Sequence, residues 1–473
     1  MIPPTGKIDR LLVELRPRLQ CANFFISFPR KFADIESTTI ELATDRITIV
    51  MKGERERYEI STGDFFQLHT QTLSSLVIKN RYLCFRVNTN EGVFEAERLS
   101  TQVSQEGTQA DEPLKLMCNI EAHKPYRLLC SNCSGPLVQE TDSRSPDVAF
   151  KRVLELPSEH LDTDDWFCHR HDHENEATNG GVVQSSPSSK LEPQPADLFY
   201  GSFYALLHRS ILHRVHIRNE RFVHCKRCLQ FLGTTRKNQP SVKLWYENIR
   251  FQQGGDPERV PIALFRTDDP LELFRLLVRR TVREFNFITH LGLPPTIKLM
   301  FELRRPGQEG DVFYLLMQIM DCQLSVFRAN QKLPDSGSCE SCSDDVDDDH
   351  RRRKECDEGQ RLNLPPHEKD DDRTLAYGEN DDEEDDDVFI DCPYRRHNIK
   401  LERYRTMKLM YRYEKYEEQP LFTFWREDSN VVNLELSEPM FSAAIRYLDA
   451  NSSYVPECYR INLGFSMSYL DIS

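Results

Sequence analysis

The sequence predicts a β-rich α+β fold of antiparallel sheets or barrel-like lobes, with a few helices and one disordered acidic insertion. Short segments rich in β-branched and aromatic residues recur along the 473-residue chain, and polar turns separate them. This spacing is typical of antiparallel sheets, sandwiches and barrels. Helical periodicity appears in two segments, and one tract is too acidic to bury a core.

Five strands are expected in the first hundred residues. Each is a short run of aliphatic or aromatic side chains, often alternating with polar ones, and turns such as Lys52-Gly53 separate them. The expected strands are 11–15, 23–28, 38–43, 46–51 and 81–87. A polar loop follows at residues 100–112.

Strands return after residue 240, where residues 243–251 alternate apolar and polar side chains. A helix is expected to begin at Asp268 or Asp269, because either side chain can cap it and Pro270 suits its first turn. The other expected elements are strands 297–303, 312–320, 404–416, 421–425 and 431–436 and a final helix at 439–448.

Changes in composition divide the chain into five regions, although length alone suggests two to three domains of about 100–200 residues each. The regions are an N-terminal β-rich region (1–113), a cysteine-containing core (114–251) with a flexible insertion (174–197), an α/β region completing the fold (252–334), a disordered acidic linker (335–391) and C-terminal strands with a helix (392–473). The insertion is rich in Ser, Pro, Asn and Gly, which favours flexibility.

The net charge of −15 belongs to one segment of the chain. Between Asp335 and Asp391 stand 23 acidic and 7 basic side chains, whereas the rest of the sequence has 53 acidic and 54 basic ones. The folded body is therefore nearly neutral, and its overall charge does not predict a nucleic-acid-binding domain. No pattern of aromatic and basic residues typical of single-strand binding is apparent either, so no direct nucleic-acid partner is expected.

Several functional classes are excluded by what the sequence lacks. No apolar run is long enough for a membrane span, and the N-terminus has Pro and charges where a signal peptide needs apolar residues. We therefore expect a protein of the cytoplasm, the nucleus or both. The phosphate-binding, dinucleotide-binding and serine-hydrolase motifs are absent, so these enzyme classes have no support.

Two C-x₂-C pairs carry the strongest chemical signal. They are Cys130-Ser-Asn-Cys133 and Cys225-Lys-Arg-Cys228, and 91 residues separate them. A two-residue spacer lets one turn place both sulfurs on one ion, and two such pairs complete the tetrahedron that zinc accepts. We expect a structural zinc ion that clips two distant parts of the central region together, because four thiolates leave no open position.

A second signal is the segment 164–173, which contains Trp166, Cys168, His169 and His171. Three interpretations stay open: further zinc ligands, a reactive thiol activated by an imidazole, or a polar loop anchored by the tryptophan. If the four paired cysteines fill one zinc site, Cys168 and His169 are available to contact another molecule.

The remaining clusters carry less information. His213 and His216 could share a helix face, but no acidic partner stands at metal-binding spacing, so we interpret them as ordinary surface or core histidines. Cys339 and Cys342 lie in the acidic tract without apolar neighbours and are not expected to form a folded site.

The order of these motifs resembles that of the HECT-like ubiquitin ligases that bind ubiquitin-conjugating enzymes. The resemblance is specific between residues 126 and 251 and loose elsewhere. It rests on YRLLCSNC (126–133), RVLELPSEHLDTDDWFCH (152–169), CKRCLQFLG (225–233) and VKLWYENIRF (242–251).

The resemblance implies a ubiquitin-protein ligase that accepts ubiquitin from a conjugating enzyme and transfers it to substrates. Its partners would be the conjugating enzyme and ubiquitin, and the two C-x₂-C pairs would be the family's zinc ligands. Cys168 is the first candidate for the thioester and Cys458 the second; Cys392 stands at the edge of the acidic tract.

An alternative function also follows from the resemblance, because family members are associated with mRNA 3′-end processing. The chain would then be a non-catalytic regulator or inhibitor that binds the cleavage-and-polyadenylation endonuclease. Trp166, Cys168 and His169 would reach into the metal active site of that enzyme, where a thiolate is a good zinc ligand.

Overall fold

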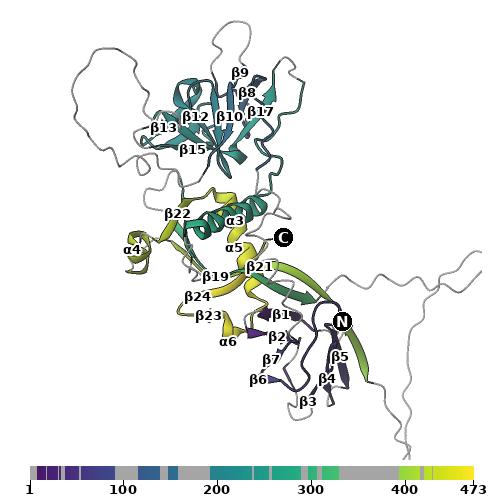
Figure 1. The fold of residues 1–473 in the computed structure, drawn as a ribbon. Coiled ribbons are helices and arrows are strands. Elements are labelled where there is room, and N and C mark those ends of the chain that lie inside the picture. The colour runs from purple at the N-terminus through teal and green to yellow at the C-terminus, as the bar shows by residue number, and fades with distance from the viewer. Residues whose placement is uncertain are drawn as a thin grey trace, which may run out of the picture.

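The computed structural model describes residues 8–16, 19–29, 31–32, 38–52, 55–90, 116–138, 147–157, 192–236, 239–254, 258–288, 297–305, 312–329, 394–415, 420–428 and 430–472. These residues form a β-rich α+β fold with antiparallel sheets, as the sequence predicts. A lobe of residues 116–254, here called the cysteine lobe, stands at one end of the molecule, and the N-terminal strands stand at the other (Figure 1). The predicted acidic linker, 335–391, lies outside the described residues, as does the predicted insertion up to residue 191.

The five predicted N-terminal strands are confirmed to within two residues at each end. The sequence missed two others, which have weaker apolar character. The strands are β1 (Arg10–Arg16), β2 (Cys21–Ser27), β3 (Thr38–Leu42), β4 (Arg46–Met51), β5 (Glu56–Ser61), β6 (Ser74–Lys79) and β7 (Tyr82–Asn88). Strands β3, β4 and β5 form a separate sheet with β20 (Arg395–Ile399), which pairs with β5 in parallel.

Two long strands connect the middle of the molecule to the N-terminal strands. β19 (Val312–Ala329) pairs with β18 (Ile297–Arg304) along its first half and with β1 near its end. β21 (Leu401–Lys415) follows β19 along almost its whole length. β22 (Val431–Glu435), β23 (Ile461–Asn462) and β24 (Phe465–Asp471) complete this ten-stranded sheet with β2, β6 and β7. One sheet therefore takes strands from the N-terminal, middle and C-terminal parts of the sequence.

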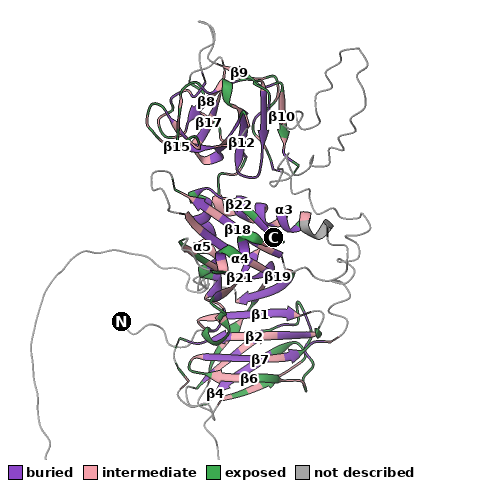
Figure 2. Cartoon of the chain, turned by 90° about the vertical axis from the view of Figure 1, so that its left-hand side faces the viewer, coloured by how far each residue is buried: buried purple, intermediate pink, exposed green. Residues whose placement is uncertain are grey.

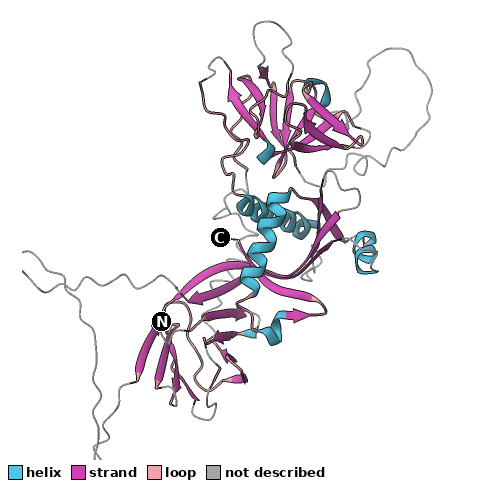
Figure 3. Ribbon diagram, turned by 180° about the vertical axis from the view of Figure 1, so that it is seen from behind, coloured by secondary structure: helices cyan, strands magenta, loops and turns pink. Residues whose placement is uncertain are grey.

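Two helices lie between the cysteine lobe and the N-terminal strands (Figure 3). α3 (Pro270–Ile288) begins where predicted, because the Asp269 carboxylate accepts a hydrogen bond of 2.9 Å from the Leu271 N–H. α5 (Glu438–Ser452) corresponds to the predicted final helix and is longer at both ends. The apolar faces of both helices join the largest core cluster. Among the described residues no helix is both long and apolar enough to span a membrane.

The strand predicted at 421–425 is wrong, since Pro420–Glu427 forms helix α4. Its five residues have no polar alternation, and Pro420 suits the first turn of a helix. Phe422 and Trp425 are three residues apart and both are buried, whereas Phe424 is 60% exposed. Helical periodicity therefore explains the burial pattern where alternation does not.

The cysteine lobe contains a seven-stranded and a three-stranded sheet. Its strands are β8 (Pro125–Cys130), β9 (Val148–Ala149), β10 (Arg152–Glu155), β11 (Asp197–Tyr200), β12 (Tyr204–His208), β13 (Val215–Arg218), β14 (Phe222–Cys225), β15 (Phe231–Thr235), β16 (Ser241–Trp245) and β17 (Ile249–Gln253). The strand predicted at 243–251 is interrupted, because a 3₁₀ turn at Tyr246–Asn248 separates β16 from β17. The turn buries Tyr246 and moves the chain from one sheet to the other.

Gly233 in β15 allows close approach of β16, and we expect Gly233→Ala to destabilise the cysteine lobe. A Cβ atom at this position would overlap the backbone oxygen of Lys243 and lie 2.9 Å from the Cα of Leu244. Backbone atoms of a paired strand cannot move aside cheaply, so the expected loss is about 1–3 kcal/mol of unfolding free energy. Thermal unfolding measures it. Gly63→Ala is the control, because a Cβ atom there would approach only Asp45, at 3.1 Å from its Cβ. Equal unfolding midpoints for the two variants would show that the close approach of β16 does not require Gly233.

A single core cluster runs through the cysteine lobe and the two helices into the central sheet, and Figure 2 shows buried segments in all three. Polar contacts join the same parts. Arg280 on α3 forms an ion pair of 2.5 Å with Glu155 at the end of β10 and donates to the Ser202 hydroxyl at 3.2 Å. Arg221 in the β13–β14 turn pairs with Glu435 of β22 at 3.5 Å. The cysteine lobe is therefore packed onto the remainder and is not a separate module.

Buried charges join the first strand to the last ones. Glu14 of β1 is fully buried, and its carboxylate accepts hydrogen bonds from Lys408 of β21 at 2.5 Å and from the Tyr469 hydroxyl of β24. Arg16 donates to the other carboxylate oxygen at 2.7 Å. These four residues are called the Glu14 cluster below. Burial alone would raise the pKa of Glu14, but the charges of Lys408 and Arg16 lower it to about 2.

Candidate metal centre

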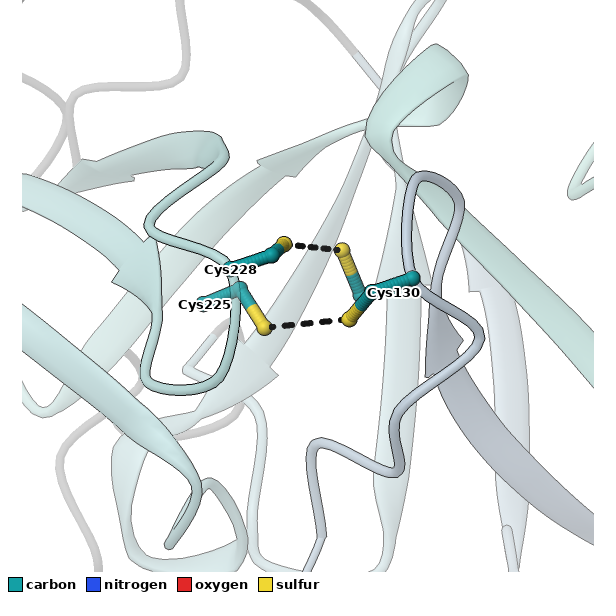
Figure 4. A group of neighbouring side chains, drawn as sticks. Cys130, Cys225 and Cys228 are labelled. Carbon is teal, nitrogen blue, oxygen red and sulfur yellow. Dashed lines mark hydrogen bonds between the residues drawn. The ribbon is translucent and has the colours of Figure 1, made fainter.

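Four cysteine thiols from two distant parts of the chain meet inside the cysteine lobe (Figure 4). Cys130 ends β8 and Cys225 ends β14, and Cys133 and Cys228 follow in the adjoining turns. The Sγ atoms of Cys130 and Cys228 are 3.7 Å apart, as are those of Cys133 and Cys225. All four sulfurs lie within 4.8 Å of one another. The structure thus gathers the four cysteines that the sequence predicts as metal ligands.

The sulfur spacing fits a tetrahedral site and not a pair of disulfides. A metal–sulfur bond of about 2.3 Å in a regular tetrahedron separates two sulfurs by about 3.8 Å. A disulfide would need about 2 Å. With four thiolates bound, an ion has no open position for water or substrate. The four cysteines could therefore hold one metal ion in a structural role.

Both C-x₂-C segments fold into the same kind of turn. The Ser134 N–H donates to the Cys130 carbonyl oxygen at 2.9 Å, and the Leu229 N–H donates to the Cys225 carbonyl oxygen at 2.9 Å. Ser134 and Leu229 also share a left-handed backbone, with φ of 52° and 60°. Residues with a side chain adopt this conformation at some cost. A metal ion bound by both cysteines of a turn would compensate for that cost.

The environment of the thiols favours a cation at their centre. Burial raises the pKa of Cys130 to about 12 and raises that of Cys225. Burial acts in the same direction on Cys228, but hydrogen bonds from the Gln230 N–H and neighbouring side chains lower its pKa to about 6. Buried thiols lose their protons when a metal ion takes the place of the protons. The donor set is thus suited to a soft or borderline divalent ion.

Two basic side chains stand between the cysteines of the second turn. Lys226 and Arg227 are both exposed, and Arg227 donates to the Cys133 carbonyl oxygen at 3.4 Å. Four thiolates around a divalent ion leave two negative charges in excess. The two cations would offset part of that excess.

The other predicted site residues are not brought to this centre. Trp166, Cys168, His169 and His171 lie outside the described residues, so their three interpretations and the endonuclease contact stay predictions. Cys458 is in the short helix α6 (Glu457–Arg460), at the other end of the molecule from the four cysteines (Figure 1).

The histidines of segment 208–216 take no part in the metal centre. His213 and His216 do not share a helix, because a 3₁₀ turn at Arg209–Ile211 leads into strand β13. His208 accepts a hydrogen bond from the Ser210 N–H at 3.2 Å and caps that turn. No group of three or more metal-binding side chains besides the four cysteines occurs in the part of the chain that the structure describes.

Fold and site together define a β-rich protein in which two cysteine turns form a four-thiol cluster that could hold a metal ion. The family model described as HECT-like ubiquitin-conjugating enzyme (E2)-binding matches residues 14–467. The chain belongs to this family, whose name indicates binding of ubiquitin-conjugating enzymes. No curated protein and no solved structure matches the chain.

Proposed function

We propose that this protein is a ubiquitin-protein ligase that binds a ubiquitin-conjugating enzyme, takes ubiquitin as a thioester and passes it to a substrate amine. The family match supports association with the conjugating enzyme. The observation that carries the transfer step is the exposure of Cys458. Of the nine cysteines that the structure describes, it alone is exposed. The metal centre would hold zinc and have a structural role.

The surroundings of Cys458 suit the docking of a partner protein. Tyr459, Ile461 and Leu463 follow it closely and are 41%, 66% and 90% exposed. Leu463 and Gly464 form the turn between β23 and β24 with φ of 50° and 80°. A leucine in a left-handed turn is unfavourable, because glycine or asparagine suits this position better. We call residues 459–464 the apolar apex and propose that it contacts the conjugating enzyme, since exposed apolar groups of this kind mark interaction sites.

The transfer step needs only an accessible thiol and a correctly placed thioester. The Cys458 sulfur, as thiolate, attacks the carbonyl carbon that joins ubiquitin to the conjugating enzyme, and the sulfur of that enzyme leaves as a thiolate. A proton passes from the attacking thiol to solvent, and the leaving thiolate takes one up. A substrate amine then displaces Cys458. Cys168, the first candidate from the sequence, lies outside the described residues and stays the alternative for this role.

The test uses conjugating enzymes charged with ubiquitin and the full chain carrying Cys458→Ala, Cys168→Ala or Cys392→Ala. We expect a ubiquitin adduct that reducing agent removes, and its loss in Cys458→Ala with binding of the conjugating enzyme unchanged. Leu463→Asp should weaken that binding about tenfold and slow adduct formation. Val260→Asp, which changes another apolar residue that is 81% exposed, is the matched control.

The possible results separate the parts of the proposal. Loss of the adduct in Cys168→Ala alone would move the thioester to Cys168. An adduct that survives all three single substitutions and their combination would contradict thioester transfer, while binding of the conjugating enzyme would still stand on its own measurement.

A further inference from the structure

Strands β13 and β14 present an outer face with a regular arrangement of side chains. Their register places His216 opposite His224 and Arg218 opposite Phe222. The Lys226 N–H donates to the Arg214 carbonyl oxygen at 3.0 Å, which brings these two residues side by side at the end of the ladder. Directly opposite residues of an antiparallel pair point to the same side of the sheet. Three rows of side chains therefore cross this face, which we call the β13–β14 face.

The other side of the same hairpin belongs to the core. Val223 and Cys225 are buried, and Val215 and Ile217 pack against the main core cluster. Because side chains alternate along each strand, the residues between them are directed away from the core. His216, with Arg214, Arg218 and Lys226, is indeed exposed. The β13–β14 face is therefore a surface of the molecule.

The cations of this face have no acidic partners in the described part of the chain. Arg214, Arg218 and Lys226 have no carboxylate within ion-pair distance among the residues that the structure describes, although Arg221 in the adjoining turn pairs with Glu435. Like charges that stand directly across a strand pair, as Arg214 and Lys226 do, destabilise a sheet. Lys226 can offset charge at the metal centre, but the two arginines cannot be explained in that way. An external anion would satisfy all three.

Aromatic rings lie next to these cations. Phe222 and Phe231 of the neighbouring strand β15 are both half-buried, with ring centroids 6.0 Å apart. Phe231 also packs against the main core cluster and lies 5.7 Å from His224, so Phe222 is the ring that the face offers. Arg221 lies over the Phe222 ring at 6.0 Å. Rings on an open sheet face, flanked by cations, are the arrangement with which proteins stack the bases and hold the phosphates of single-stranded nucleic acid.

We propose that the β13–β14 face binds single-stranded nucleic acid. Arg214, Arg218 and Lys226 would contact phosphates, and Phe222 would support a base. An acidic peptide would match the cations but would give the rings no role. A divalent metal ion between His216 and His224 is disfavoured, because three positive side chains surround that pair. The linear sequence conceals this pattern, since core residues alternate with the residues of the face.

The test measures fluorescence anisotropy of labelled RNA and DNA oligonucleotides of one mixed sequence with the full-length metal-containing protein. The first variant is Arg214→Ala with Arg218→Ala and Lys226→Ala. Its control changes three exposed basic residues elsewhere, by Arg266→Ala, Lys400→Ala and Arg446→Ala. The second variant, Phe222→Leu, removes the ring but keeps an apolar side chain. Metal content and circular dichroism verify that each variant is folded.

We expect the first variant to lose at least tenfold in affinity and the control to stay within about twofold. The dependence of log affinity on log salt should become shallower by about 2, since each phosphate contact with a single strand contributes about 0.7. A variant in which each arginine is exchanged for lysine and the lysine for arginine, as in Arg214→Lys, keeps the charges and should retain most of the salt dependence. Phe222→Leu should lose about fivefold or more at an unchanged slope.

Three outcomes would overturn the proposal. The first is equal affinity of the cation variant and its control. The second is a loss of oligonucleotide affinity in the cation variant without a loss in Phe222→Leu, which would mean that the face attracts polyanions by charge alone. The third is binding of a peptide with the sequence of residues 335–391 in place of the oligonucleotides, which would assign the cations to the acidic segment of the chain.

Discussion

Cys225→Ser is expected to remove the metal ion from the purified protein and to unfold the cysteine lobe. The variant keeps three thiolates, and the hydroxyl oxygen of the new serine binds zinc more weakly than a thiolate does. The ion would then no longer hold the two cysteine turns together. Metal binding contributes on the order of 10 kcal/mol to the folding of small zinc domains, which is comparable to the whole stability of a typical domain. The effect should therefore exceed that of any apolar substitution in the same lobe.

Elemental analysis and thermal unfolding measure this effect. The wild-type protein should contain about one zinc per chain, and Cys225→Ser should contain much less and unfold at a far lower temperature. Cys458→Ser, at the exposed cysteine, is the control and should retain both metal and midpoint. Because the core cluster continues from the cysteine lobe into the helices, the loss should also destabilise α3 and α5. Metal-free wild-type protein with a normal midpoint would refute the structural role.

Glu14→Gln is expected to destabilise the protein by about 3–5 kcal/mol, the usual cost of removing one partner from a buried ion pair. The amide cannot balance the charges of Lys408, whose side chain is 9% exposed, and Arg16. Burial lowers the pKa of Lys408, so this lysine depends on the carboxylate to stay charged at low cost. Chemical denaturation at neutral pH measures the loss. Glu59→Gln, which breaks a half-exposed pair with Arg57, should cost about 1 kcal/mol or less.

Acid unfolding tests the same cluster without a substitution. The pKa of Glu14 is about 2 in the folded protein, whereas the ordinary value for a glutamate is 4.5. Its contribution to stability is therefore complete above pH 4.5 and is lost as the pH falls towards 2. The difference in unfolding free energy between wild type and Glu14→Gln should shrink over this window. A constant difference down to pH 2 would show that the carboxylate is not the stabilising species.

The cluster of four cysteines could be predicted because each half of it is a local motif. Two cysteines with two residues between them already indicate a turn with both sulfurs on one side, so only the meeting of the two halves had to be inferred. The Glu14 cluster had no such signal. Glu14 and Lys408 are 394 residues apart in the chain, and neither stands in a motif. A charged residue within an apolar strand gives no indication of which distant residue will pair with it.

The fold shows the same division between local and long-range information. Strand positions followed from alternation, and Asp269 was one of two predicted caps for α3. The strand interruption at Tyr246–Asn248 and the helix α4 were missed because both sequences are rich in aromatic residues, which are compatible with strand or helix. The length of β19 and its two successive partners depend on pairing that no local pattern encodes.

The apolar apex has one local signal in the sequence. Gly464 suits a turn, and apolar residues that a turn would expose stand on both sides of it, a short distance after Cys458. The β13–β14 face needed the register of two strands before its cations and rings appeared on one side. Surface sites formed by alternation across strands are therefore harder to recognise from sequence than sites formed within a turn.

The pairing of β1 with β19, and the contact of Glu14 with Tyr469, have a consequence for the synthesis of this protein. The partners of β1 are synthesised long after it, because β19 spans Val312–Ala329 and β24 spans Phe465–Asp471. Until β19 is made, β1 has an unpaired edge, and until β21 and β24 are made, Arg16 is the only partner of Glu14 from the Glu14 cluster that is present. Long-range pairing of this kind closes slowly and leaves strand edges open to aggregation. The nascent protein should therefore depend strongly on chaperones, and truncation before β24 should leave the N-terminal strands insoluble and not merely less stable.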